Sequence, residues 1–214
     1  MRVEDAFNLR ICDNFGCDFD DSCNEDFFGD LPEQLDAEDE TAWGISKFVI
    51  FPAGTPDKVI KIPFEGGYFH LYTSNTDDYE TEFCPNTNIV DYCEEEADIY
   101  TEAEELGLEC FFAETKFGGY TKDGTPFYVS ERILGYEPNE ETSQDSYKKA
   151  EENRCALPQS FVADAIEQFG LEKVQELIAF LKTKNLHDFH DGNIGVRKDG
   201  SVCILDYSDW REDF

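Results

Sequence analysis

The amino-acid sequence predicts an α+β domain with two unequal lobes. Segments of β-branched and aromatic residues occur in pairs, and each pair surrounds a turn that contains Gly and Asp. One segment with a helical spacing of apolar residues lies between the first two pairs, and two more helical segments follow. The expected order is therefore two strands, a helix, two strands, two helices and a final hairpin.

The composition is strongly acidic. Forty-nine Asp and Glu residues against 17 Lys and Arg residues give a formal net charge of −32. A field of this sign repels the phosphates of nucleic acids and of anionic membranes, so binding to nucleic acid or membrane is not expected. It suits a basic protein partner, or it serves solubility alone. With 40% hydrophobic residues, including 19 Phe and 10 Tyr, the chain can form a packed core.

A cytoplasmic location is expected. No segment approaches the roughly 18 consecutive apolar residues of a membrane-spanning helix. The N-terminus lacks the basic and then apolar pattern of a signal peptide. The eight cysteines are therefore expected to be reduced thiols. The cluster of Cys12, Cys17 and Cys23 has neither a standard zinc spacing nor a nearby His, so no zinc site is expected there.

Residues 1–42 form an acidic N-terminal segment. Fourteen Asp and Glu residues occur in it against two Arg residues, and five Phe residues lie among them (Phe7, Phe15, Phe19, Phe27 and Phe28). This mixture predicts a segment that docks on the body of the protein or on a partner, because it is too acidic to form a core of its own.

Residues 43–134 are expected to form a β-sheet with one helix. The elements are a β-hairpin, an acidic amphipathic helix after a polar stretch, and two further strands (47–51 with 58–64, then 89–108, then 110–134). Gly107 ends the helical pattern. The turn Lys122-Asp123-Gly124 separates the last two strands.

Residues 135–214 are expected to form a helical region and a closing hairpin. A polar stretch over 136–157 comes first, and Pro158 is a favourable start for a helix. Two apolar stripes, separated by Gly170, predict two helices, and a polar hairpin follows them (161–169, 174–181, and 186–196 with 201–210).

The residues best suited to chemistry lie in the closing hairpin. Asp188 and Asn193 lie in its polar loop, and Asp206 follows thirteen residues after Asn193. Magnesium prefers oxygen ligands and is usually held by one or two carboxylates together with substrate phosphates. Asn193 and Asp206 are therefore candidate magnesium ligands. Asp188 is a candidate for orienting or deprotonating an attacking hydroxyl group.

A second candidate lies in the expected sheet. Lys61 is placed within the apolar strand Val59-Ile60-Lys61-Ile62, where an ammonium group is costly unless it meets a phosphate or a carboxylate. The acidic helix over 89–108 offers that carboxylate.

Together these residues resemble the protein-kinase-like fold. The resemblance is to aminoglycoside and choline phosphotransferases, whose catalytic loop has the form H-x-D-[LF]-H-x-x-N, and to short kinase-like proteins of phages and bacteria. It covers residues 43–210. It implies that Asp188 is the catalytic aspartate, Asn193 the metal-binding asparagine and Asp206 the metal-binding aspartate that corresponds to the DFG element.

The resemblance also assigns the cofactors and the remaining site residues. Lys61 matches the phosphate-binding lysine of the V-A-I-K strand, and Glu96 is its expected helix partner because it shares a helix face with Tyr100 and Ala103; Glu94 and Glu95 remain alternatives. ATP and magnesium are the implied cofactors. The implied hinge between lobes, which would meet the adenine, lies near residues 131–136.

The chain departs from the kinase pattern at several points. Trp43-Gly44-Ile45-Ser46 stands in place of a G-x-G-x-x-G phosphate loop, Leu186 occupies the position of the loop histidine, and Tyr207-Ser208 replaces Phe-Gly. Only eight residues follow Asp206. The expected architecture is therefore a two-lobed kinase-like fold with a truncated C-terminal lobe, which does not suit a regulated protein kinase.

Two functions follow as hypotheses. The first is an ATP- and magnesium-dependent phosphotransferase that acts on a hydroxyl group, with a small-molecule acceptor favoured over a protein. The alternative is a pseudokinase or acidic binding module that captures a basic protein; an acidic nucleic-acid mimic is a third. The residues also have purely structural interpretations, in which Asp188 and Asn193 form a turn, Lys61 extends to solvent and Glu96 lies on a solvated face.

Overall fold

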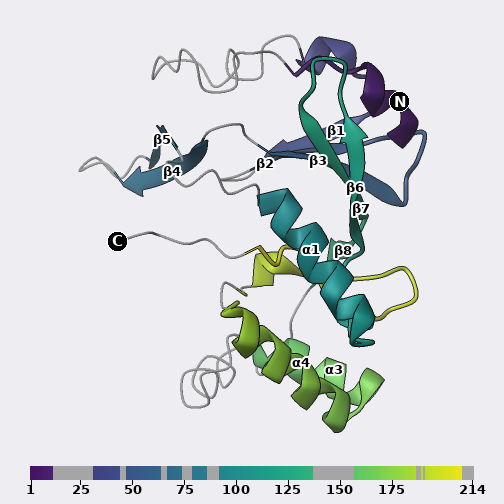
Figure 1. The fold of residues 1–214 in the computed structure, drawn as a ribbon, viewed down its shortest axis with the longest axis vertical. Coiled ribbons are helices and arrows are strands. Elements are labelled where there is room, and N and C mark those ends of the chain that lie inside the picture. The colour runs from purple at the N-terminus through teal and green to yellow at the C-terminus, as the bar shows by residue number, and fades with distance from the viewer. Residues whose placement is uncertain are drawn as a thin grey trace. The chain divides into compact units, whose positions relative to one another are not determined.

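The computed structural model describes residues 1–11, 31–43, 47–63, 67–73, 79–85, 92–136, 157–186, 189 and 191–208. It is a mixed α+β structure in which the paired strands of each sheet run antiparallel (Figure 1). The predicted α+β class is therefore confirmed. No helix of the described residues is long and apolar enough to cross a membrane.

The chain divides into two compact units. The first consists of Met1–Ala97 and Thr115–Glu131, and the second of Asp98–Glu114 and Arg132–Phe214. The chain therefore passes from one unit to the other three times. The first passage lies within a helix, after Ala97, and the other two lie directly before and directly after the strand pair of residues 115–131. The expected division into 1–42, 43–134 and 135–214 stays a prediction.

The first unit contains a five-stranded antiparallel sheet. The strands lie in the order β1-β2-β3-β7-β6 (β1 Glu40–Trp43, β2 Lys47–Phe51, β3 Lys58–Pro63, β7 Pro126–Glu131 and β6 Thr115–Tyr120). The predicted hairpin of β2 and β3 is confirmed, and so is the pairing of β6 with β7 around the turn at Gly124. The edge strand β1 was not predicted, because Glu-Thr-Ala-Trp lacks alternating apolar residues.

Part of the third predicted strand is wrong. Cys110 and Phe111 belong to a short 3-10 helix, η4 (Glu109–Phe111), and not to a strand. Phe111 and Phe112 are both fully buried in the second unit, whereas β6 begins only at Thr115. Two successive apolar residues are typical of a buried strand, but a tight turn that points both rings into a core has the same sequence pattern.

One face of the five-stranded sheet carries the core of the first unit. Apolar side chains of the sheet pack there with residues of the N-terminal segment (Phe48, Ile50, Ile60, Ile62 and Phe127 with Ala6, Leu9, Ile11 and Leu31). Ala6 and Leu31 belong to two short 3-10 helices, η1 (Val3–Asn8) and η3 (Leu31–Gln34), and Leu9 directly follows η1. The described parts of the acidic N-terminal segment therefore dock on the body of the protein, which is one of the two expected outcomes.

A buried carboxylate holds this N-terminal segment in place. The side chain of Asp39 is fully buried and accepts hydrogen bonds from the backbone N–H groups of Ala53 (2.8 Å) and Asp36 (2.9 Å) and from the amino group of Met1 (2.9 Å). Burial acts to raise the pKa of Asp39. The hydrogen bonds and the charge of the amino group outweigh burial, so the pKa of Asp39 lies below its ordinary value.

Acid should therefore weaken the first unit through Asp39. A lowered folded-state pKa means that the stabilisation is complete above the unfolded-state pKa of about 3.9 and is lost as pH falls through the folded value. We expect Asp39→Asn to lower the free energy of unfolding at pH 7 by about 1–3 kcal/mol, because an NH2 group replaces one of the two accepting oxygens and the N–H donors of that oxygen lose their acceptor. Urea unfolding at pH 7 and pH 3 measures both effects. Asp57→Asn replaces an exposed aspartate and is the matched control. If acidification lowers the free energy of unfolding equally in Asp39→Asn and in the wild type, Asp39 is not the source of the acid sensitivity.

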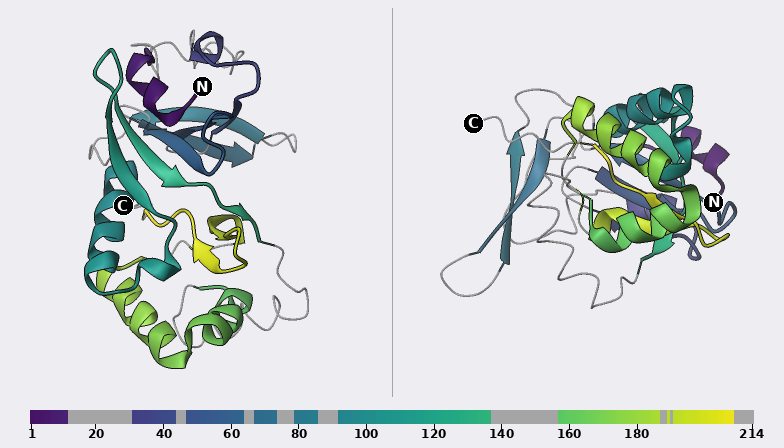
Figure 2. Two further views of the ribbon diagram at one scale, coloured as in Figure 1. Left: turned by 90° about the vertical axis from the view of Figure 1, so that its right-hand side faces the viewer. Right: turned by 90° about the horizontal axis from the view of Figure 1, so that it is seen from below.

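A separate hairpin follows β3 in the chain. Strands β4 (Gly67–Thr73) and β5 (Tyr79–Pro85) pair antiparallel as a two-stranded sheet (Figure 2). This hairpin was not predicted, since its region was interpreted only as a polar stretch. The strand Gly-Tyr-Phe-His-Leu-Tyr-Thr is rich in β-forming aromatic residues, but no Gly- or Pro-containing turn separates it from its partner.

The predicted acidic helix is confirmed as α1 (Tyr92–Glu105). It ends where the sequence indicates, because Gly107 adopts the left-handed φ of 68° that favours glycine. The N–H group of Leu108 then donates to the carbonyl of Ala103 at 2.7 Å, which satisfies one of the last carbonyl groups of the helix. The buried face includes Cys93, Tyr100 and Ala103, as the helical spacing predicts.

The second unit contains the two predicted helices side by side (Figures 1 and 2). Helix α3 (Gln159–Phe169) and helix α4 (Leu171–Lys184) are separated by Gly170, whose φ is 88°. Their buried stripes agree with the predicted spacing, although Ile166 is exposed (Phe161, Ala165, Val174, Leu177 and Leu181).

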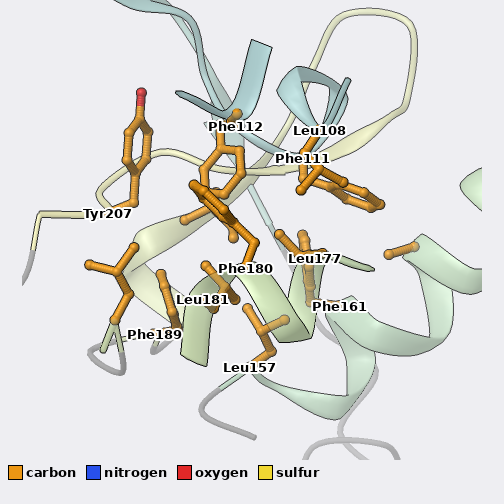
Figure 3. Packing of buried hydrophobic residues seen from close by; sticks show 14 of the residues in the cluster. Leu108, Phe111, Phe112, Leu157, Phe161, Leu177, Phe180, Leu181, Phe189 and Tyr207 are labelled. Atoms are coloured by element: carbon orange, nitrogen blue, oxygen red, sulfur yellow. The ribbon is translucent and has the colours of Figure 1, made fainter. Parts of the chain in front are cut away.

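An aromatic core fills the second unit (Figure 3). The ring of Phe112 packs edge-on against the rings of Tyr207 and Phe180, with centroids 5.0 and 5.9 Å apart. The hydroxyl group of Tyr207 donates to the carbonyl of Ala113 at 2.7 Å, so the polar end of this buried ring is satisfied. These contacts connect the segment after α1 with the end of the closing hairpin.

The closing hairpin belongs to a three-stranded sheet. Strands β9 (Ile194–Val196) and β10 (Val202–Ile204) pair around a turn at Gly200, as predicted, and β8 (Leu134–Gly135) extends the sheet beside β9. Asp199 closes the turn by accepting hydrogen bonds from the hydroxyl and N–H groups of Ser201. These two bonds lower the pKa of Asp199.

Candidate functional site

Lys61 lies on an interior strand of the first unit. It is opposite Val49 of β2 and Tyr128 of β7, so β3 is covered on both edges at this position. Because side chains alternate along a strand, Lys61 leaves the face opposite to the apolar one that carries Ile60 and Ile62. Its side chain is 7% exposed. The interpretation that Lys61 extends to solvent is therefore wrong.

Glu96 of α1 forms an ion pair with Lys61. The carboxylate is fully buried, and one of its oxygens, Oε2, accepts the hydrogen bond from Lys61 Nζ. The expected contact between Lys61 and Glu96 is thus present, and Glu96 is not on a solvated helix face. Glu94 is exposed and Glu95 is half-buried, because they lie on other faces of the helix.

Lys47 is the site residue that sequence reasoning missed. Its ammonium group donates to Oε1 of Glu96, and its side chain is 7% exposed. The signal was present in the predicted hairpin. If Phe48 and Ile50 of β2 face the core, Lys47 and Val49 must face the other side of the sheet, next to Lys61.

Removing a buried partner of such an ion pair is more damaging than removing a surface charge. Two charges taken out of water lose their hydration, and only their mutual attraction and hydrogen bonds compensate for that loss. The buried carboxylate of Glu96 is therefore stable only because α1 holds it beside Lys47 and Lys61. This arrangement fixes two ammonium groups on one face of the sheet.

The second unit brings Asn193 and Asp206 to the same end of its hairpin. Asn193 ends the short 3-10 helix η5 (Asp191–Asn193), and Asp206 follows β10 by two residues. The N–H group of Leu205 donates to the carbonyl of Asn193 at 2.9 Å, which extends the register of Ile194 with Ile204. Both side chains are half-buried, and Ser208 Oγ donates to Asp206 Oδ1 at 3.4 Å.

The side chains of Asn193 and Asp206, at this end of the hairpin, suit magnesium. A carboxylate and a side-chain amide oxygen are the hard ligands that magnesium prefers. Among the described side chains, no three His, Cys, Asp or Glu residues gather in a way that could hold a metal ion. Magnesium would therefore take its remaining ligands from phosphate oxygens and water, as it usually does.

Asp188 lies outside the described residues, as do His187 and His190. Leu186 and Phe189 on either side of it are buried in the second unit. The role assigned to Asp188 by the resemblance therefore stays a prediction.

Three cysteines whose side chains the structure describes are free thiols. Cys93, Cys110 and Cys203 are not in disulfides, and Cys93 and Cys203 are buried. Burial, followed by the charge of Glu109, raises the pKa of Cys110, which disfavours the reactive thiolate. Cys12, Cys17 and Cys23 lie outside the described residues.

Comparison with known proteins does not identify a family for this chain. No protein-family model matches the chain, and no curated protein is significantly similar to it. The kinase-like interpretation of the sequence therefore stays a prediction.

Proposed function

We propose that the chain is a kinase-like phosphotransferase that uses ATP and magnesium to phosphorylate a hydroxyl group. A small-molecule acceptor is favoured over a protein. The observation that carries the proposal is the buried ion pair between Lys61 and Glu96. It joins an interior strand of an antiparallel sheet to an acidic helix, which is the arrangement that the kinase-like resemblance implies.

The ion pair supports phosphate binding for a physical reason. A lysine hydrogen-bonded to a buried carboxylate keeps one position, so its Nζ is placed in advance for an anionic ligand. An exposed lysine would lose side-chain entropy on binding the same ligand. Lys61 is therefore assigned to the phosphates of ATP, with Glu96 as the residue that positions it.

The end of the closing hairpin supports a metal role. Asn193 and Asp206 would hold magnesium through an amide oxygen and a carboxylate oxygen. Bound magnesium supplies charge neutralisation for the phosphates. The cytoplasmic location remains part of the same proposal.

The remaining chemistry is assigned to Asp188. The acceptor hydroxyl oxygen forms a bond to the γ-phosphorus as the bond between that phosphorus and the bridging oxygen of ADP breaks. The hydroxyl proton goes to the Asp188 carboxylate, and ADP leaves with the electron pair. Catalysis would come mainly from positioning and from stabilisation of charge.

Thermal-shift titration with ATP, with and without magnesium, tests the proposal. The wild type should be stabilised by ATP in a magnesium-dependent way, because a ligand that binds only the folded state raises the melting temperature. Asp206→Asn should lose the magnesium-dependent part. Glu167→Gln removes one exposed acid from the same unit and should behave as the wild type. An equal magnesium-dependent shift in Asp206→Asn would overturn the metal assignment.

The acidic binding module is the second candidate, and the exposed acids of α1 favour it. Glu94, Asp98, Glu104 and Glu105 are exposed along this helix. The expected partner is a basic protein, bound in a salt-sensitive way. The two functions differ in the titration above, because a binding module that lacks nucleotide binding shows no shift with ATP and magnesium.

A further inference from the structure

Two buried lysines lie diagonally across β2 and β3. Lys47 is opposite Pro63 in the strand register, and Lys61 is opposite Val49, so the two lysines are offset by two residues on the same face of the sheet. Diagonal neighbours of this kind are about 7–8 Å apart at their backbones. Long side chains from such positions can meet at one point.

Glu96 is the point at which they meet. Lys47 Nζ donates to Oε1 and Lys61 Nζ donates to Oε2 of the same carboxylate, which is fully buried. The carboxylate therefore acts as a spacer that holds two ammonium groups side by side.

We propose that Lys47 and Lys61 form a two-ammonium site for a polyphosphate, with Glu96 setting their separation. The inference rests on the proposed function and extends it, because it adds Lys47 as a second phosphate-binding residue and selects the ligand class. Burial strengthens both attractions, since water screens charges less in the protein interior. Each lysine contributes a charge-assisted hydrogen bond, which is stronger than a neutral one.

Two fixed cations favour a ligand with adjacent phosphate groups over a single phosphate. A diphosphate or triphosphate can give one phosphate group to each lysine, whereas orthophosphate has one group for both. The polyphosphate chain can belong to a nucleoside triphosphate or can be inorganic. The recognition chemistry is the same for both sources.

Calorimetric titration of the full chain with orthophosphate, pyrophosphate, tripolyphosphate and ATP with magnesium tests this site. The wild type should bind tripolyphosphate at least tenfold more tightly than orthophosphate. Lys47→Met, which keeps the aliphatic stem, should weaken tripolyphosphate binding by about tenfold, the effect of one charge-assisted hydrogen bond. Lys47→Arg should retain most of the affinity. Lys122→Met removes an exposed lysine of the same unit and should change nothing.

The ammonium signals of the wild type provide a second measurement that does not depend on a variant. In ¹⁵N-lysine NMR spectra, tripolyphosphate should shift the Nζ signals of both Lys47 and Lys61 and leave that of Lys122 unchanged. Unchanged binding in Lys47→Met, or a shift at Lys61 without one at Lys47, would overturn the two-lysine site.

The titration with ATP and magnesium distinguishes a failure of this inference from a failure of the proposed function. If ATP competes with tripolyphosphate and Lys47→Met weakens both, the site serves the nucleotide. If tripolyphosphate binds through both lysines but ATP with magnesium does not compete, the two-lysine site stands and the phosphotransferase proposal fails. If both tripolyphosphate and ATP with magnesium bind equally well to Lys47→Met and to the wild type, the inference fails and the phosphotransferase proposal stands.

Discussion

Replacing Glu96 with alanine is expected to lower the free energy of unfolding by about 3–5 kcal/mol. The carboxylate is fully buried between two ammonium groups whose side chains are 7% exposed. Its removal leaves two positive charges close together in a region of low dielectric constant, where their repulsion is poorly screened. An effect of this size is a large fraction of the stability of a typical domain.

Urea unfolding measures this change, with Asp98→Ala as the control. Asp98 lies on the same helix but is exposed, so its replacement should alter stability by less than about 0.5 kcal/mol. A triple variant with Lys47→Met, Glu96→Leu and Lys61→Met should recover much of the loss, because apolar side chains of similar size often replace buried ion networks without penalty. A loss below about 1 kcal/mol in Glu96→Ala would show that the ion pairs are not buried in solution.

Asp188→Asn is expected to lower ATP turnover by about 10²–10⁴-fold, the usual contribution of a general acid or base. The amide keeps the size of the side chain but does not accept the hydroxyl proton. Stabilisation by ATP and magnesium should persist, because the proposal assigns phosphate binding to Lys61 and metal binding to Asn193 and Asp206. The variant therefore separates chemistry from binding.

Turnover is measured as ADP release, with Glu167→Gln as the control of equal charge change. Circular dichroism of Asp188→Asn should match that of the wild type. If the variant retains the turnover of the wild type, Asp188 is not the catalytic residue. A wild type that binds ATP and magnesium without any turnover would instead indicate a pseudokinase.

The sequence predicted the bounds of an element correctly where its residue pattern is compatible with only one local structure. The turn before β3, the glycine after α1 and the glycine between α3 and α4 each ended an element where predicted. Glu96 was the expected partner of Lys61, with Glu94 and Glu95 as alternatives. The structure selects Glu96, which shares a buried helix face with Tyr100 and Ala103.

The sequence was insufficient where distant segments decide the structure. Phe111 and Phe112 were interpreted as a strand, but their burial depends on α4 and on the end of the closing hairpin. Strand β1 exists because β2 offers it an edge, and Glu-Thr-Ala-Trp shows little intrinsic preference. Lys47 is a different case, because strand alternation already places it on the same sheet face as Lys61, whereas its contact with Glu96 depends also on the position of α1.

The measurement that tests the account most directly is a double-mutant cycle on the affinity for ATP with magnesium. Under the proposed function, Lys61 binds the phosphates of ATP and Asp206 binds its magnesium, so Lys61→Met and Asp206→Asn should each weaken binding by about tenfold or more. Their effects should not add in the double variant, because both residues act on one ligand. Lys122→Met and Glu167→Gln should match the wild type. Wild-type affinity in either Lys61→Met or Asp206→Asn would contradict the kinase-like assignment.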